Sequence, residues 1–168
     1  MQVKSRMFLV FGVLVTGLPS AQAGEWIPNS KDCFTRFQKA LKAGEAEGIW
    51  EMLAPESQKA ADAAAQTLRE KYASMSVTEK ARVEAVLQLR ATKLSKLTGI
   101  DLVGSKAFRE FHATLLLATR LNPERTQDGI EMKYEVSGTA GKARLMSPTG
   151  DKRNYKMILA MPSLPGVD

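Results

Sequence analysis

The chain of 168 residues carries 24 basic and 18 acidic residues, for a formal net charge of +6, and has one cysteine and one histidine. A single cysteine excludes an intramolecular disulfide, and a single histidine excludes metal sites built from several histidines. Basic residues are spread along the chain without clusters or interleaved aromatics, which argues against nucleic-acid binding. We therefore expect no metal, no cofactor and no nucleic-acid partner.

Residues 1–23 have the pattern of an export signal. A basic start precedes a 12-residue apolar core at 7–18, and small residues lead to a junction between Ala23 and Gly24. The core is shorter than the ~20 residues that span a bilayer, which favours cleavage over a permanent anchor and over stable membrane insertion. We expect an exported protein, periplasmic or secreted, from a bacterium. The alternative is an uncleaved signal that holds an accessory subunit at the inner membrane.

Cleavage would leave 145 residues with 22 basic and 18 acidic side chains, a net charge of +4. This length suits one α+β domain at 24–161, followed by a flexible tail at 162–168.

Two helices are predicted first, from about residue 29 to Lys42 and from Glu45 to Leu53. Cys33 shares a helix face with apolar residues in the first of them. We therefore interpret it as a buried small hydrophobe, with a reactive or intermolecular thiol as the alternative. The apolar stripe of this first helix consists of Cys33, Phe34, Phe37 and Leu41.

The next two helices are predicted at Pro55–Ala73 and after a capping box at Ser76 and Glu79. Alanine-rich spacing in the first of these favours close packing through one narrow face. That face is expected to consist of Ala60, Ala64, Leu68 and Tyr72, and the following helix is expected to bury Val83, Val86 and Leu87.

A further helix is predicted from Ser105 to about Leu121, closed by Pro123 because the residue before a proline leaves the helical region. We expect it to be the most buried helix. Its inward face would carry Phe108, Phe111, Leu115 and Ala118.

After Pro123 the hydrophobic period changes from 3.6 to 2. Residues 130–136 alternate apolar and polar side chains, as in a half-buried strand, and 142–146 read as its hairpin partner. Residues 154–161 are apolar on both faces, which predicts a strand that is central or covered on both sides. The order of elements predicts N-terminal helices packed on a curved antiparallel meander of three or four strands.

This order resembles small exported bacterial proteins of the nuclear transport factor 2-like superfamily, which have a cystatin-like, cone-shaped α+β fold. The matching segments are 37–45, with a helix ending in Gly44, 49–57, with Trp50 before a leucine and a later serine, and Leu97-Thr98-Gly99-Ile100-Asp101. The chain departs from the pattern at its end, where a Gly-Trp-Lys-like strand is replaced by Leu159-Ala160-Met161-Pro162. This departure implies a last strand that is shortened or paired differently. The superfamily includes isomerases, dehydratases, cyclases and noncatalytic binding modules, so the resemblance does not choose a function.

Three side chains are candidates for a ligand site, namely Trp50, His112 and Tyr134. Trp50 and Tyr134 are large amphipathic residues that either anchor the core or line a cavity. His112 is a weak catalytic candidate, because general acid or base chemistry would need a neighbouring carboxylate and a water-excluding pocket. A half-buried or surface histidine is the interpretation we favour.

The sequence therefore predicts an exported noncatalytic binding or interaction module. Its partner would be a small apolar ligand or an envelope protein, bound at the concave face of the sheet. The alternative is a small cone-fold isomerase or dehydratase that uses His112. Neither the ligand nor the oligomeric state follows from the sequence.

Overall fold

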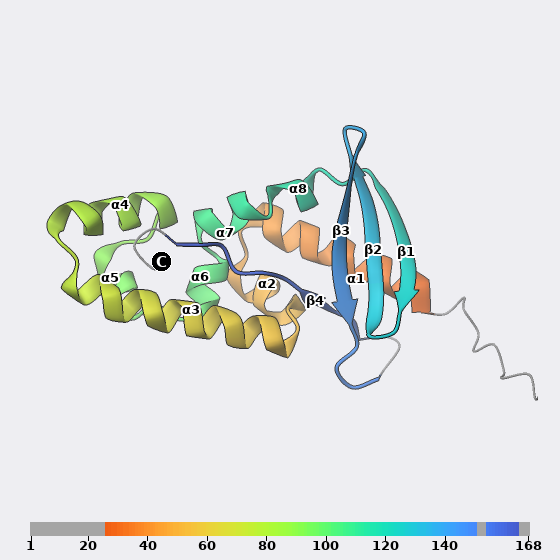
Figure 1. Cartoon of the computed structure of the whole chain (residues 1–168), viewed down its shortest axis with the longest axis horizontal. Helices are drawn as coiled ribbons and strands as arrows, with labels where there is room; N and C mark the ends of the chain where they lie inside the picture. Colours follow the sequence, from red (N-terminus) through yellow and green to blue (C-terminus); the bar gives the residue numbers. More distant parts are fainter. Residues whose placement is uncertain (1–25, 151–153, 165–168) are drawn as a thin grey trace, which may run out of the picture.

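The computed structural model describes residues 26–150 and 154–164, with side chains from Asn29 onward. The predicted signal peptide and its junction at Ala23 and Gly24 lie outside the described residues. Within them, helices precede strands along the chain (Figure 1). The helices are α1 (Trp26–Ala43), α2 (Ala46–Met52), α3 (Pro55–Ser74), α4 (Val77–Leu87), α5 (Ala91–Leu94), α6 (Gly99–Val103), α7 (Lys106–Phe111) and α8 (Ala113–Leu116). The strands are β1 (Arg120–Thr126), β2 (Gly129–Val136), β3 (Thr139–Met146) and β4 (Lys156–Ile158).

The four strands form one antiparallel meander in the order β1-β2-β3-β4. Helix α1 packs across one face of this sheet, and the other helices extend away from it (Figure 1). The α+β fold class predicted from the sequence is therefore confirmed.

Helix α1 buries the predicted stripe of Cys33, Phe34, Phe37 and Leu41. It ends at Gly44, whose φ of +70° is accessible to glycine at little cost. The two hydrogen bonds of a Schellman motif close this end, from the Gly44 amide to the Leu41 carbonyl and from the Glu45 amide to the Ala40 carbonyl.

Helices α3 and α4 form as predicted, but each buries a set of residues that differs in part from the predicted set. In α3 Leu68 and Tyr72 are buried as predicted, but the small buried residues are Ser57, Ala61 and Ala65 rather than Ala60 and Ala64. A strict spacing of four drifts around a helix of about 3.6 residues per turn, so the four predicted positions do not lie on one buried stripe. In α4 the predicted Val86 is 37% exposed, since the helix packs through a narrower stripe that consists of Val83 and Leu87. The predicted capping box of Ser76 and Glu79 is present.

The predicted helix from Ser105 to Leu121 is wrong in its second half. Helix α7 stops at Phe111, α8 follows as a single turn, and the chain is already extended at Arg120. Pro123 lies inside β1, where it pairs with Met132 rather than closing a helix. A proline is accepted there because β1 is the edge strand of the sheet and has no partner on its outer side in the described structure.

The expectation that this helix would be the most buried is also wrong. Phe108 and Leu115 are buried, but Phe111 is 53% exposed and Ala118 lies beyond the end of α8. Phe111 therefore does not share the buried face of Phe108 and Leu115.

The last strand is three residues long and occupies an edge of the sheet. Of the two positions expected for 154–161, central or covered on both sides, the central one is therefore wrong, whereas the shortening implied by the departure at 159–162 is observed. Its outer edge is nevertheless covered, because Met157 forms a bridge with Leu53 and accepts a hydrogen bond of 2.8 Å from the Ala54 amide. The bond holds β4 against the junction of α2 and α3.

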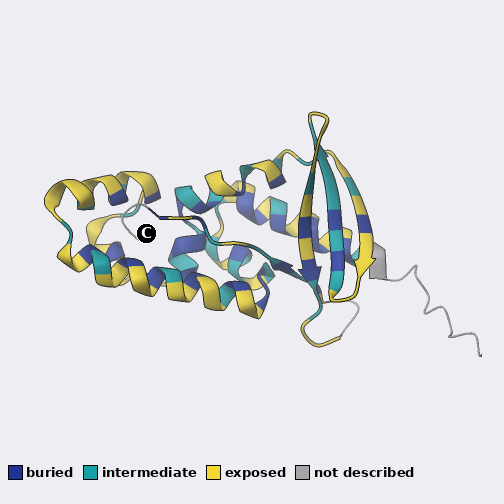
Figure 2. Ribbon diagram, viewed as in Figure 1, coloured by how far each residue is buried: buried dark blue, intermediate teal, exposed yellow. Residues whose placement is uncertain are grey.

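Buried residues fall into two hydrophobic clusters (Figure 2). The first joins α1 to the inner face of the sheet, and the second lies among α3, α4 and α6. Leu164 is only 3% exposed and belongs to the second cluster, so the segment expected to be a tail contributes a core side chain there. Residues 165–168 lie outside the described residues.

Candidate functional site

His112 is 7% exposed and is held in place by three contacts. Its Nε2 lies 3.0 Å from the carbonyl oxygen of Ala160. A carbonyl only accepts, so Nε2 carries the donated proton. The rings of Phe108 and Phe111 lie 4.6 Å and 4.9 Å from the imidazole centre. Burial lowers the pKa of His112, and the bond to Ala160 opposes this effect.

These contacts give His112 the role of a connector between the break after α7 and residue 160. Among the described residues, no carboxylate forms an ion pair with it. A histidine that acts as a general base is oriented by a carboxylate and faces a ligand cavity. The neighbours of His112 do not form this arrangement.

Cys33 is buried, and its thiol donates a hydrogen bond of 3.2 Å to the Tyr155 carbonyl. Burial raises the pKa of the thiol to about 12, with partial opposition from the positive charges of Arg36 and Lys156. A nucleophilic cysteine needs a lowered pKa and access to solvent. Cys33 therefore behaves as the small buried hydrophobe that the sequence favoured.

Trp50 and Tyr134 are partly buried and pack against the first hydrophobic cluster. Trp50 lies against Gly99, where a β-carbon would come within 2.9 Å of the indole. The Tyr134 ring lies 6.1 Å from the Phe34 ring, on the side of the sheet that α1 covers. Within the described structure no ring contact or hydrogen bond joins any two of Trp50, His112 and Tyr134, so the three candidates do not form one site.

A hollow of about 360 Å³, which we name the sheet hollow, lies at the β1 and β2 end of the sheet. Its lining includes Arg120, Asn122, Lys133, Tyr134 and Glu135. Because side chains alternate along a strand, the charged members face away from α1, whereas the Tyr134 ring faces it.

The charges at the sheet hollow are already paired. Arg120 lies 3.6 Å from Glu135, and Lys133 lies 2.5 Å from Glu124. Mutual neutralisation of exposed pairs is typical of a solvated sheet surface. The rest of the lining is Leu121, Gly138 and Ala140, so no unpaired charge marks a ligand position in the sheet hollow.

A second hollow, also of about 360 Å³, lies between α1, α4, α7 and α8, and we name it the helical hollow. Apolar side chains line part of it and three cations line another part. The apolar residues are Leu41, Ala113 and Leu116, and the cations are Lys42, Lys106 and Arg109.

Arg109 is the feature that separates the two hollows. Its side chain is half-buried, its Nε is fully buried, and this Nε has no hydrogen-bond partner. One Nη lies near Gly44, at 3.0 Å from where a β-carbon on that glycine would stand. A buried N–H without an acceptor costs about 1–3 kcal/mol.

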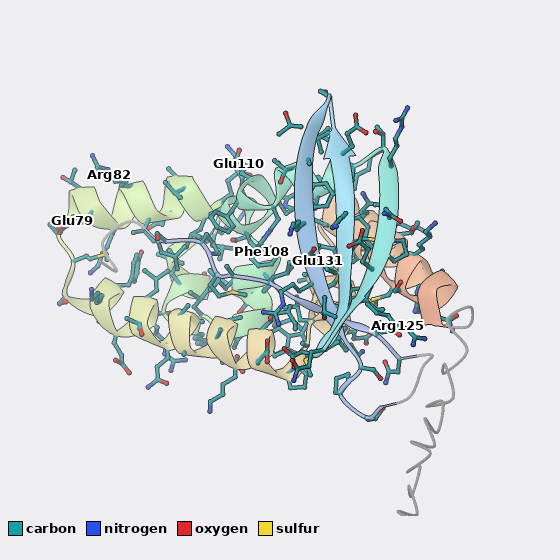
Figure 3. The ribbon with its side chains drawn as sticks, turned by 45° about the vertical axis from the view of Figure 1, so that its right-hand side comes forward. Glu79, Arg82, Phe108, Glu110, Arg125 and Glu131 are labelled. Carbon is teal, nitrogen blue, oxygen red and sulfur yellow. The ribbon has the colours of Figure 1, made fainter. Side chains whose placement is uncertain are left out.

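The net charge of the helical hollow is positive. Glu110 is its only acidic lining residue, and it forms an exposed 3.5 Å pair with Lys106. Figure 3 shows Glu110 at the outer surface of α7 and Phe108 pointing into the interior. Lys42 and Arg109 form no ion pair with the described acids.

Sequence reasoning did not find the helical hollow. Lys42 lies more than sixty residues before Lys106 and Arg109, and an isolated lysine or arginine reads as a solvated charge. The only local signal is the spacing of three between Lys106 and Arg109, which places them on one helix face.

Comparisons of the chain with protein families, with curated proteins and with solved structures find no match. Within residues 26–150 and 154–164, no three acidic, histidine or cysteine side chains gather in a way that could hold a metal ion. In the same part of the chain, no helix is both long and apolar enough to cross a membrane.

Proposed function

We propose that this protein is an exported, noncatalytic binding module that holds a small ligand in the helical hollow. The observation that carries the proposal is a hollow lined by three cations, among them the half-buried Arg109, and by the half-buried apolar side chains of Ala113 and Leu116. A volume of about 360 Å³ lies within the range of pockets that enclose small molecules.

The positions of the two reactive side chains support a binding role rather than catalysis. The Cys33 thiol is buried with a raised pKa, and the His112 imidazole is bonded to a backbone carbonyl. Neither residue lines the helical hollow. A cone-fold isomerase or dehydratase that uses His112 would need that ring to face a ligand cavity.

Kinship with the nuclear transport factor 2-like superfamily is part of the same proposal. It is supported by the sequence segments around Gly44, Trp50 and Gly99 and by a meander sheet covered by one long helix. Export rests on the signal pattern of residues 1–23. Intact-mass measurement of the protein from its native compartment should give an N-terminus at Gly24, and retention of residues 1–23 would support the membrane-held alternative.

The test of ligand binding is native mass spectrometry of the full-length protein, expressed and processed in a bacterial host and purified without denaturation. Wild type should retain a small-molecule mass that is lost in Ala113→Trp, which fills the hollow, and kept in Ala140→Trp, which adds the same ring to an exposed strand position. Leu116→Trp provides a second filling variant, and thermal unfolding checks that each variant is folded. Absence of a bound mass in wild type, or its retention in both folded filling variants, would refute the proposal.

A further inference from the structure

From the charge and burial of its lining, we propose that the ligand of the helical hollow is an amphipathic oxyanion, with a carboxylate or phosphate group on a short apolar body. This inference rests on the proposed function and names the chemical class of the ligand. Its site is formed by Arg109, Lys42 and Lys106 on one side and by Leu41, Ala113 and Leu116 on the other.

The first step concerns the missing acceptor. The Arg109 Nε–H is removed from water and has no acceptor in the described structure. A guanidinium offers several N–H donors in one plane, a geometry that matches the two oxygens of a carboxylate or phosphate. Because the Nε–H has no surface that a ligand in the hollow could contact, such an oxyanion would pair with the Nη–H groups of Arg109.

The second step concerns the sign of the charge. Lys42 and Lys106 line the same hollow as Arg109, and the one acid there, Glu110, is exposed and bonded to Lys106. Three cations against one carboxylate favour an anion and disfavour a cation. Partial burial of the cavity wall reduces screening by solvent and salt, which strengthens the attraction.

The third step concerns the rest of the ligand. Ala113 and Leu116 are half-buried beside the cations and present apolar surface to the hollow, whereas Leu41 is fully buried and presents none. A free inorganic anion would leave this apolar surface without a contact. An apolar body next to the charged group would cover it.

A structural interpretation of Arg109 is available and makes a different prediction. Its guanidinium lies beside Gly44, close to the last carbonyls of α1, where a cation stabilises the negative end of a helix dipole. Under that interpretation, Arg109→Gln would lower stability in the absence of ligand and would not discriminate between ligands of different charge.

The experiment uses the processed full-length protein and three probes of equal chain length, namely octanoate, octan-1-ol and octylammonium, with inorganic phosphate as a fourth. Calorimetry should show octanoate binding at least about 10-fold more tightly than octan-1-ol, and octylammonium binding more weakly than both. Phosphate should bind more weakly than octanoate, because it lacks the apolar body. The octanoate affinity should fall as salt is raised.

Variants of Arg109 and Glu110 test which side chains cause the preference for octanoate. Arg109→Gln should weaken octanoate by about 10- to 100-fold and leave octan-1-ol unchanged. Arg82→Gln, on the exposed surface of α4, is the matched control and should change neither. Glu110→Gln should strengthen octanoate binding, because it removes the one negative charge that competes for Lys106.

Nitrogen-15 NMR provides a readout that a purely structural role would not give. The Arg109 Nε–H signal, assigned from its loss in Arg109→Gln, should shift on addition of octanoate and stay in place with octan-1-ol. Equal affinities for octanoate and octan-1-ol, no binding of octanoate, or an unshifted Arg109 signal would overturn the inference. The co-purified mass and the tryptophan variants decide the proposed binding function separately, because they do not depend on the charge of the ligand.

Discussion

Replacing Gly141 by alanine should destabilise the fold, because the Tyr134 ring occupies the space that a β-carbon would need. The two residues are directly opposed on β2 and β3. A β-carbon at Gly141 would lie 2.4 Å and 2.5 Å from two ring carbons of Tyr134 and 2.7 Å from its hydroxyl oxygen. Carbon atoms pack at about 3.5–4.0 Å, so the ring would have to move by about 1 Å, against the neighbouring Phe34.

Overpacking of this kind destabilises by about 1–3 kcal/mol. The backbone of Gly141 is not in the left-handed region, so alanine also restricts the unfolded chain and returns about 0.4–1 kcal/mol. The expected net loss is about 1–2 kcal/mol of unfolding free energy. In a Tyr134→Ala background the clash is absent, and the same replacement should be neutral or stabilising by about 0.5 kcal/mol.

The assay is urea unfolding of wild type, both single variants and the double variant. The cycle should give a coupling energy of about 1.5–2.5 kcal/mol between positions 134 and 141. Gly138→Ala is an informative comparison, because its φ of +82° strains alanine although nothing lies within 4 Å of the added carbon. Its loss should therefore persist unchanged in the Tyr134→Ala background. Additive effects at 134 and 141, within about 0.3 kcal/mol, would refute the assigned steric role of the ring.

Three further predictions concern individual side chains. The Cys33 thiol should resist a thiol reagent in the folded protein and react with it in urea. Because the pKa of this thiol in the folded protein lies above the ordinary value of 9.0, its contribution to stability should be complete below about pH 9. This contribution should be lost as the pH rises towards 12. The His112 pKa is lowered, so the contribution of this residue to folding stability is present above about pH 6.5 and lost as the pH falls. In urea unfolding, the His112→Leu variant should therefore lose less stability than wild type between about pH 7.5 and 5. Equal losses in the two proteins would contradict this. Ser76→Ala should lower the unfolding free energy by about 1 kcal/mol by removing the cap of α4, whereas Thr78→Ala should change it by less than about 0.5 kcal/mol; similar values for both would argue against the cap.

Local chemistry accounts for the parts of the fold that the sequence predicted. The stripe of α1, the glycine that ends it and the capping box of α4 each depend on residues within a few positions of one another. The alternation in 130–136 likewise identifies β2 from its own residues.

Strand β1 could not be predicted in the same way. Its sequence is polar, contains Pro123 and follows three leucines that favour a helix. It becomes a strand because seven consecutive residues pair with β2. The break at His112 also depends on distant chain, since its ring bonds to Ala160, 48 residues away.

The same reasoning applies to the candidate site. Their residue types make Trp50, His112 and Tyr134 candidates, whereas the structure places them at three separate packing positions. Arg109 is not predicted from the sequence, because an arginine on a helix is usually a solvated charge and only the folded structure shows that its Nε is buried. The lack of an acceptor for that atom is a property of the assembled helices and has no counterpart in the sequence.

The attachment of residues 154–164 to the helices bears on the order in which the protein folds. Ser57 and Leu159 exchange two hydrogen bonds across 102 residues, Ala54 donates to Met157, and Leu164 completes the second cluster. Contacts between such distant residues require closure of a long loop and slow folding. For a chain exported as proposed, the helical half would lack these partners until 154–164 had left the secretion channel. Late formation of these contacts would keep the chain loose during translocation and let it become rigid afterwards.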